Sequence, residues 1–310
     1  MLSICIPIYN CDVTSLVREL SVQANKIGIQ YEIICIDDCS EKSFIAFNEV
    51  DCNKYGKYFQ LNKNIGRSKI RNLFLNYAKF DYMLFLDCDS IIISDNFIEN
   101  YCAILKKQKP EVICGGRIYQ KIKPEKQKRL RWKYGLIKES QPLEIRQMDP
   151  NKSFMTNNFV VSRKLLGNLK FNEHLSQYGH EDTLFGFQLK KNNILIKHIN
   201  NPILNGGLET NSEYIKKTEA GLLNLIYVID YTGNDPELIK DIAILKYYQK
   251  VKKKHLTGLI ISVFYMFGTS IKYLLSKGFA NLYLFDFYKL GFFAAQIRLK
   301  NRNSRYQINQ

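Results

Sequence analysis

The sequence lacks the cysteine pattern of a disulfide-stabilised protein. All eight cysteines lie in the first half of its 310 residues, several within apolar runs, and none forms a Cys-x-x-Cys pair. Such a distribution is typical of reduced thiols in a cytosol. The chain also opens directly on a strand-like stretch at 2–8, without the basic flank, long apolar run and small-residue cleavage site of a signal peptide. We therefore expect a protein that is not secreted.

Acidic residues are also few. The 29 Asp and Glu stand against 45 Lys and Arg, which leaves a formal net charge of +16. A surplus of this size points to nucleic acid, anionic lipid or a phosphorylated small molecule, and charge alone does not choose among them. Disorder is excluded because 46% of the residues are hydrophobic and 13% are aromatic. The length allows one large domain, or one domain with an appendage.

From residue 2 to about 115, short β-branched runs alternate with amphipathic stretches. This pattern predicts strands at 2–8, 31–36, 58–61 and 82–86 and helices at 13–26 and 67–78. The order argues for an α/β fold with a Rossmann-like, mixed but mostly parallel sheet and helices on its faces. Such sheets bind ligands at the carboxyl ends of their strands, so the residues that follow each strand are the first candidates for a site.

The pattern changes beyond residue 150. We expect strands at 153–162 and 194–199, and helices at 182–191 and 213–229. A further helix is expected to end at 254, with Asp235 as its cap and Pro236 in its first turn. Seven basic residues between 121 and 133 predict a solvated loop or a short helix.

The C-terminal segment is apolar and basic at once. Residues 256–271 carry no charge, and these sixteen residues fall short of the roughly 20 needed to cross a bilayer. A second apolar stretch at 282–295 has Lys289 and Arg298 beside it. Basic and aromatic residues flanking apolar helices are typical of a segment in a membrane interface. An ordinary helical pair packed on the domain is the alternative.

Two carboxylates, Asp87 and Asp89, follow the predicted strand at 82–86 with Cys88 between them. Together they can hold a hard divalent ion, because the diphosphate of a nucleotide supplies further oxygen ligands. A turn with a capping aspartate is the alternative. After the first strand, Tyr9 can lay its ring against a nucleobase. After the second, Asp37-Asp38 can accept a hydrogen bond from uracil N3–H, although an Asp/Ser turn is the better explanation for this motif taken alone.

Two further motifs lie at helix starts. Arg67 and Arg71 are four residues apart and share a helix face, where guanidinium groups can meet a base or a diphosphate. A basic solvated face is the alternative. Glu181 and Asp182 fall at or near the start of another helix, whose dipole favours the ionised form that a general base needs. A simple N-cap at Asp182 is the alternative, and one residue can serve both purposes.

In this order the motifs resemble the family-2 glycosyltransferases with the A-type nucleotide-sugar fold (GT-A), from residue 2 to about 208. Pro-Ile-Tyr-Asn, Asp-Asp-x-Ser, Asn-x-Gly-x-x-x-x-Arg-Asn, Asp-x-Asp and Glu-Asp all occur where that family has them. The resemblance implies that Asp89, with Asp87, holds Mn2+ or Mg2+ on the diphosphate. It implies a nucleotide, usually uridine, among nine residues: Pro7, Tyr9, Asp37, Asp38, Asn64, Gly66, Arg67, Arg71 and Asp87.

The same resemblance assigns the chemistry to the acidic pair. Asp182, next to Glu181, would act as general base on an acceptor hydroxyl, with inversion at the anomeric carbon. The acceptor side would be formed by Asn157 and Asn158, and His180 would orient the acids. Where family members offer a histidine toward metal or phosphate, this chain has an asparagine at 205, so a third protein ligand is in doubt. His198 is expected to be structural.

The resemblance also divides the chain. Residues 1–210 would form the catalytic domain, with a nucleotide-sugar half at 1–115 and an acceptor half at 116–210, and residues 211–310 a helical extension. The end of the chain resembles bacterial surface-polysaccharide members, whose acceptors are commonly lipid-linked. We therefore expect sugar transfer from a nucleotide diphosphate, with UDP favoured, to a glycan or lipid-linked glycan. The place would be the cytoplasmic face of the cell membrane, with contact through 256–300.

Two other functions stay open at this point. A sugar nucleotidyltransferase shares the fold group, but such enzymes carry a glycine-rich loop with Lys or Arg after the first strand, whereas this chain reads Tyr-Asn-Cys-Asp at 9–12. A basic module that binds nucleic acid or membrane would use the segment at 121–133. Against it, the acids stand at strand ends in catalytic order, which a binding module does not need.

Overall fold

The structure is a computed structural model that describes residues 1–175 and 178–308. It divides into two compact units, and each is described by itself. Unit 1 comprises 1–121, 136–175 and 181–207, and unit 2 comprises 122–135, 178–180 and 208–308. The last and longest segment of the second unit begins at 208, near the predicted boundary at 210, but the unit also takes a segment from the middle of the chain.

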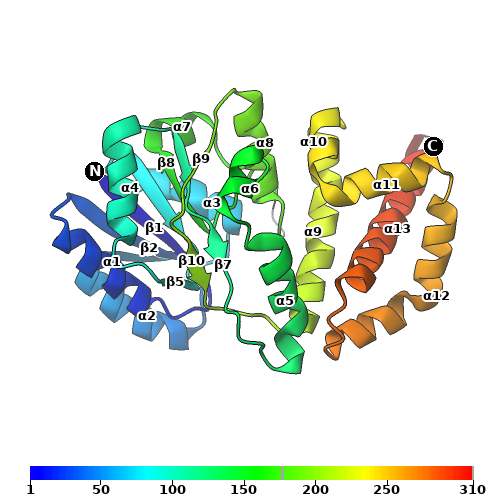
Figure 1. Cartoon of the computed structure of the whole chain (residues 1–310), viewed down its shortest axis with the longest axis horizontal. Coiled ribbons are helices and arrows are strands. Elements are labelled where there is room, and N and C mark those ends of the chain that lie inside the picture. Colours follow the sequence, from blue (N-terminus) through cyan, green and yellow to red (C-terminus); the bar gives the residue numbers. More distant parts are fainter. Residues whose placement is uncertain (176–177, 309–310) are drawn as a thin grey trace. The chain divides into compact units, whose positions relative to one another are not determined.

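Unit 1 is built on a seven-stranded sheet (Figure 1). Its order is β3-β2-β1-β4-β8-β6-β9, and only β8 runs antiparallel to its neighbours. The mixed, mostly parallel sheet is therefore confirmed. The strands are β1 (Leu2–Ile8), β2 (Tyr31–Asp37), β3 (Lys57–Gln60), β4 (Tyr82–Leu86), β6 (Val112–Cys114), β8 (Asn158–Ser162) and β9 (Lys197–His198).

Helices cover both faces of this sheet. On one face lie α1 (Thr14–Lys26), α2 (Lys42–Tyr55) and α4 (Phe97–Gln108); on the other lie α3 (Arg67–Leu73), α7 (Arg163–Asn168) and α8 (Glu181–Lys191). Alternate residues of β1 feed the two cores, with Ile4 and Ile6 on one side and Cys5 on the other. Each fully buried aliphatic side chain contributes about 1.5–3 kcal/mol, so both layers fix the strand ends firmly.

Several predicted elements are shorter in the structure. The helix predicted to reach 78 ends at Leu73 and continues as a 3-10 turn, Phe74–Asn76. The strand predicted from 153 begins at Asn158, and that predicted at 194–199 is reduced to Lys197–His198. Apolar composition alone does not mark the ends of a strand, because loop residues of unit 1 are buried too, such as Phe154 and Ile196.

A small second sheet in unit 1 was not predicted. It has the order β5-β10-β7, formed by β5 (Ser90–Ile92), β10 (Ile203–Asn205) and β7 (Arg117–Ile118). The antiparallel pairing of β10 with β5 sets Asn205 opposite Ser90. This register carries residues from 205 to 207 onto the segment that follows β4.

Unit 2 is helical: α5 (Arg129–Tyr134), α9 (Asn211–Tyr231), α10 (Pro236–Asp241), α11 (Ala243–Lys253), α12 (Thr257–Ser276) and α13 (Leu282–Ile308). Asp235 caps α10 as expected, but that helix ends at Asp241 and a separate helix follows. Of the two alternatives for the basic segment at 121–133, a solvated loop or a short helix, the short helix is confirmed. The segment forms a 3-10 turn and α5, because Leu130 is fully buried among Tyr214, Ile215 and Phe285.

Within unit 2, α13 packs along α12 and against α9, and α11 crosses from α10 to the start of α12 (Figure 1). Among the described residues, α12 is the one helix whose length and mean hydropathy of 1.5 are enough to cross a membrane, by length and composition alone. Only 22% of its apolar window is buried. Its outward side is therefore an exposed apolar surface of unit 2.

Candidate active site

The polar residues predicted at the strand ends meet at one edge of the main sheet. β1, β2 and β4 run parallel, so Asp37 at the end of β2 lies at the same edge as Tyr9 and Asp87, which follow β1 and β4. β8 runs the other way, which brings the residue before it, Asn157, to that edge as well. The backbone N–H of Asp87 donates to the carbonyl of Asn157 at 3.2 Å.

Asp87 is held between two arginines. Arg71 Nη2 donates to its Oδ1 at 3.1 Å, and Arg117 Nη2 lies 3.5 Å from its Oδ2. Arg71 is 1% exposed, so it would be costly to bury without this carboxylate. Both oxygens of Asp87 thus face guanidinium groups, and its predicted part in metal binding stays a prediction.

Arg117 is a site residue that the sequence reasoning missed. It lies in β7 and bridges Asp87 to Glu139, which it contacts at 3.1 Å. The signal that could have found it is the pair of glycines before it. A Cβ on Gly115 would lie 2.2 Å from the hydroxyl of Tyr101, and Gly116 has a φ of +97°. Two glycines directly before an arginine thus indicate a turn of fixed backbone conformation, which determines where the guanidinium lies.

Asp89 is contacted by the end of β10 and the two glycines that follow it. Asn205 Nδ2 donates to Asp89 Oδ2 at 3.1 Å, and the N–H of Gly206 donates to the Asp89 carbonyl at 2.8 Å. A side chain on Gly207 would come within 3.1 Å of the same carboxylate. The residue that replaces the histidine of the resembling family therefore lies directly on the second carboxylate of the Asp-x-Asp motif.

Glu181 of the acidic pair contacts two members of the arginine cluster, which comprises Arg67, Arg71 and Arg117. Glu181 is 5% exposed and lies 3.3 Å from Arg67 Nη1 and 3.6 Å from Arg71 Nη1. Burial by itself would raise the pKa of Glu181, but the two arginines outweigh it and hold the pKa below its usual value. Glu181 is therefore the ionised, fixed member of the pair.

Asp182 is shifted the other way. Burial first, and then the charge of Glu181, raise the pKa of Asp182 to about 6, although the N–H of Thr183 donates to its Oδ1 at 2.7 Å. The expectation that the helix start would favour its ionised form is thus outweighed by burial. Helix α8 begins at Glu181, so Asp182 lies in the first turn and is not its N-cap. Two neighbouring acids with opposite shifts are typical of a catalytic pair.

The comparisons with known proteins identify the family of the chain. The family model described as glycosyl transferase family 2 matches residues 3–169, more than half of the chain. The chain belongs to this family. Over 97 residues it is 36% identical to an uncharacterized glycosyltransferase of Haemophilus influenzae; the match covers 31% of this chain and 38% of that protein.

Two solved structures show the fold of this family-2 glycosyltransferase. The mannosyltransferase PcManGT of Pyrobaculum calidifontis, in complex with GDP-Man and Mn2+, matches with a TM-score of 0.58 and 12% identity over 97% of this chain and 86% of that one. Glucosyl-3-phosphoglycerate synthase of Mycobacterium tuberculosis, in complex with Mn2+, UDP and phosphoglyceric acid, matches with a TM-score of 0.51 and 16% identity. The match covers 74% of this chain and 78% of that one. The GT-A fold is thereby confirmed.

The predicted nucleotide residues differ in how the structure uses them. Asp38 accepts hydrogen bonds from the N–H groups of Ile65 and Gly66 at 2.7 and 3.0 Å, which ties the end of β2 to the loop before α3. Asp37 accepts from Ser40 N–H and the Tyr58 hydroxyl. Both carboxylates thus position the loops around the site.

The remaining nucleotide candidates are more open. Tyr9 is 53% exposed at the end of β1, where its ring is available for stacking. Asn64 and Arg67 are exposed, whereas Pro7 and Gly66 are half-buried at the same loops. The predicted contacts of all these residues with a nucleotide stay predictions.

The two predicted acceptor-side asparagines have different roles. Asn158 is fully buried: its Nδ2 donates to Gly116 and Asn201 carbonyls at 2.9 Å, and Tyr101 donates to its Oδ1. The prediction that Asn158 faces an acceptor is therefore wrong, because its amide is used within the core. Asn157 is 2% exposed, and within the described residues its amide oxygen and nitrogen have no hydrogen-bond partner. A buried amide of this kind is suited to a ligand.

The histidines behave differently from one another. His198 is 2% exposed; Arg146 donates to its Nδ1 at 2.9 Å, and its Nε2 donates to the Pro150 carbonyl at 2.8 Å. Its structural role is confirmed. His180 has a positive φ of 67° and belongs to unit 2, so its predicted part in orienting the acids stays a prediction.

Proposed function

We propose that this chain is an inverting glycosyltransferase that moves a sugar from a nucleotide diphosphate donor, UDP in the first place, to a hydroxyl of a glycan or lipid-linked glycan. The observation that carries the proposal is the position of Arg71, which contacts both Asp87 of the Asp-x-Asp motif at the sheet edge and Glu181 of the acidic pair at the start of α8. UDP is named first because the resembling family usually binds uridine; of the two related structures, one holds UDP and the other GDP-Man, so they support a nucleotide diphosphate donor without choosing its base.

In this mechanism Asp182 accepts the proton of the acceptor hydroxyl. A pKa of about 6 leaves it mostly ionised at neutral pH yet basic enough to take a proton. The acceptor oxygen attacks the anomeric carbon from the side opposite the diphosphate, so the bond to the diphosphate breaks as the new bond forms. Glu181 stays ionised beside Arg67 and Arg71, and its charge keeps the pKa of Asp182 raised.

The leaving diphosphate gains charge that the site must neutralise. Arg67 and Arg117 are within reach of the strand ends, and preorganised donors of this kind stabilise a developing charge strongly. Asp89 would hold Mn2+ or Mg2+, and such an ion would act as a Lewis acid on the diphosphate. Carboxylate oxygens such as those of Asp89 are the ligands that a hard ion prefers, and the diphosphate of the donor would supply the others. Among the described residues, no group of three or more His, Cys, Asp or Glu is placed to hold a metal ion.

We also propose that unit 2 holds the enzyme at the cytoplasmic face of a membrane. The support is α12, whose outward stripe consists of six exposed apolar and aromatic side chains: Leu259, Tyr265, Met266, Phe267, Tyr273 and Leu274. Its opposite side packs in unit 2 through Ile261, Gly268, Ile271 and Leu275. A helix with one side packed and the other apolar lies along an interface more readily than across it.

The test is a donor screen with a matched pair of variants. UDP-, GDP- and dTDP-sugars are compared by thermal shift and by donor consumption with and without Mn2+. We expect a UDP-sugar to give the largest metal-dependent shift. Asp89→Ala should lose the metal-dependent part of donor binding, while Asp182→Asn should keep donor binding and lose turnover. Release of pyrophosphate from a nucleoside triphosphate and a sugar phosphate would instead identify a nucleotidyltransferase.

A further inference from the structure

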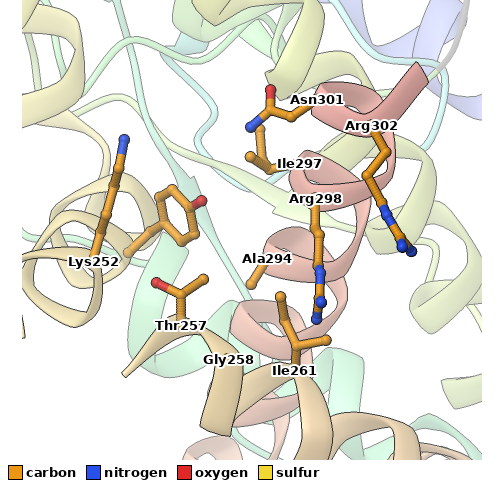
Figure 2. A pocket seen from close by; sticks show the side chains of 10 residues that line it. Lys252, Thr257, Gly258, Ile261, Ala294, Ile297, Arg298, Asn301 and Arg302 are labelled. Atoms are coloured by element: carbon orange, nitrogen blue, oxygen red, sulfur yellow. The ribbon is translucent and has the colours of Figure 1, made fainter. Parts of the chain in front are cut away.

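Unit 2 contains a cavity of about 530 Å3 that the sugar transfer does not use. It lies where the end of α11, the start of α12 and the C-terminal part of α13 come together (Figure 2). Lys252 stands on the α11 side, and Arg298 and Arg302 stand on the α13 side. Ile261 and Ala294 contribute apolar surface between them.

The cationic side chains of this cavity are not neutralised by the protein. Within 1–175 and 178–308, no carboxylate forms an ion pair with Lys252, Arg298 or Arg302. Between 243 and 302 there are eleven Lys and Arg and a single acid, Asp286, which pairs with Lys289 at 2.6 Å. A cavity with an uncompensated positive charge is suited to an anion.

The start of α12 adds to this preference. Thr257 and Gly258 line the cavity, and the N-terminus of the helix has no side-chain cap. The first main-chain bond into the helix comes from Ile260 N–H to the Leu256 carbonyl at 3.0 Å, so the N–H groups of the residues before it make no intrahelical bond. A Cβ on Gly258 would meet no atom within 4 Å, which leaves room beside the backbone. Phosphate oxygens suit such a combination of N–H groups and cations.

The apolar surroundings point to a lipid as the source of the phosphate. The outward stripe of α12 begins at Leu259, directly after the cavity residue Gly258, and Leu259 is 60% exposed. Further along, Met266 is 71% and Phe267 50% exposed. A free phosphate ion would make no favourable contact with an apolar surface that starts at the rim of its site. A phospholipid uses both, since its headgroup and acyl chains lie side by side.

We propose that this cavity binds the phosphate group of an anionic membrane lipid while the outward stripe of α12 lies against the acyl chains. The proposal rests on the membrane contact proposed above and gives it a defined headgroup site. Lys252, Arg298 and Arg302 would contact the phosphate, and Ile261 and Ala294 would accommodate the start of the lipid chains. Binding would therefore need both the cations of the cavity and the apolar stripe.

The experiment is vesicle co-sedimentation of the full chain. Vesicles of phosphatidylcholine alone are compared with vesicles that also contain phosphatidylglycerol. The double variant Arg298→Gln/Arg302→Gln removes two charges inside the cavity. The matched control Lys253→Gln/Lys254→Gln removes two charges from its neighbourhood, since these lysines are exposed and do not line the cavity. Since a basic residue near an anionic surface contributes about fivefold in affinity, we expect the control to lose at most about 25-fold and the cavity variant to lose clearly more.

Equal losses in the two variants would overturn the cavity, because diffuse attraction to the surface would then explain the binding. A second variant, Met266→Ser/Phe267→Ser, should abolish sedimentation while the helices stay folded by circular dichroism. Inorganic phosphate and glycerol phosphate, added as competitors, should not release the protein at concentrations that leave the Debye length unchanged. Release by either would show that the cavity binds a soluble phosphate compound and would contradict the lipid proposal.

Donor consumption is measured on the same preparations. It should stay at the wild-type rate in the cavity variant, because none of the exchanged residues belongs to unit 1. If the cavity variant binds vesicles as well as wild type and also consumes donor at the wild-type rate, the lipid site is refuted and the sugar transfer is not. A wild-type chain that sediments with vesicles but consumes no nucleotide sugar would refute the proposed transfer alone.

Discussion

The two units treat positive charge in opposite ways. In unit 1, Arg71 is 1% exposed, and its guanidinium is compensated by Asp87 and Glu181. In unit 2, Arg298 and Arg302 are exposed, and no ion pair neutralises them within the described residues. The sequence indicates part of this difference, because residues 243–302 hold eleven Lys and Arg but a single acid, Asp286.

The difference teaches what each region is built for. Guanidinium groups fixed by buried carboxylates are preorganised, so they stabilise a developing charge without first having to move. Long cationic side chains at a surface keep their freedom, and salt screens them within about 8 Å at physiological ionic strength. Unit 1 therefore fits chemistry, and unit 2 fits reversible attachment. Each prediction below tests one side of this contrast.

The largest expected effect is on turnover. Asp182→Asn removes the proton acceptor and should lower the rate of sugar transfer by on the order of 10²–10⁴. Because it also removes a partly buried carboxyl whose pKa is raised, the variant should melt at a higher temperature than wild type. Transfer assays and thermal melts measure the two effects together. Wild-type turnover in this variant would show that the base is another residue.

Stability should separate the two kinds of arginine. Arg71→Met leaves Asp87 and Glu181 without their buried partner, and breaking a buried pair costs roughly 3–5 kcal/mol. Arg298→Met changes an exposed side chain and should alter stability by less than about 0.5 kcal/mol. Urea denaturation of both variants gives the free energies of unfolding. Similar values for the two would mean that the contrast between the units is not energetic.

The sequence predicted the frame of unit 1 well. The strands at 2–8 and 82–86 agree residue by residue with β1 and β4, because continuous apolar runs of that length have few other places in a fold. The acids after these strands reach one edge for the same topological reason. Order along the chain was thus sufficient to bring Asp87 and the end of β1 together.

What could not be predicted depends on packing between distant segments. Asn158 and Asn157 are neighbours in sequence, yet one is used within the core and the other has an unsatisfied amide. Arg117 was not predicted because its partners, Asp87 and Glu139, are 30 and 22 residues away in the sequence. The raised pKa of Asp182 was not predicted either, because burial is a property of the folded unit and here outweighs the helix dipole.

The pH dependence of transfer tests the acidic pair more finely. The rate should rise with pH through about 6 as Asp182 loses its proton, and fall about tenfold for each unit below that. Glu181→Gln removes the neighbouring charge that raises this pKa, so the midpoint should move to lower pH. Transfer rates between pH 4.5 and 8, roughly the range in which the two midpoints are expected, check this. An unmoved midpoint in the variant would show that the two acids do not interact.

The smallest expected effect concerns Asp89. Asn205 lies 3.1 Å from its Oδ2, at the position where the resembling family carries a histidine. Asn205→His would place an imidazole nitrogen beside that carboxylate and offer a further ligand to a divalent ion. We expect the Mn2+ concentration for half-maximal donor binding to fall by up to about tenfold. Titration calorimetry with donor present measures it, and Asn205→Gln serves as the control that keeps an amide. If histidine and glutamine act alike, the ion is held by Asp89 and the donor without help from position 205.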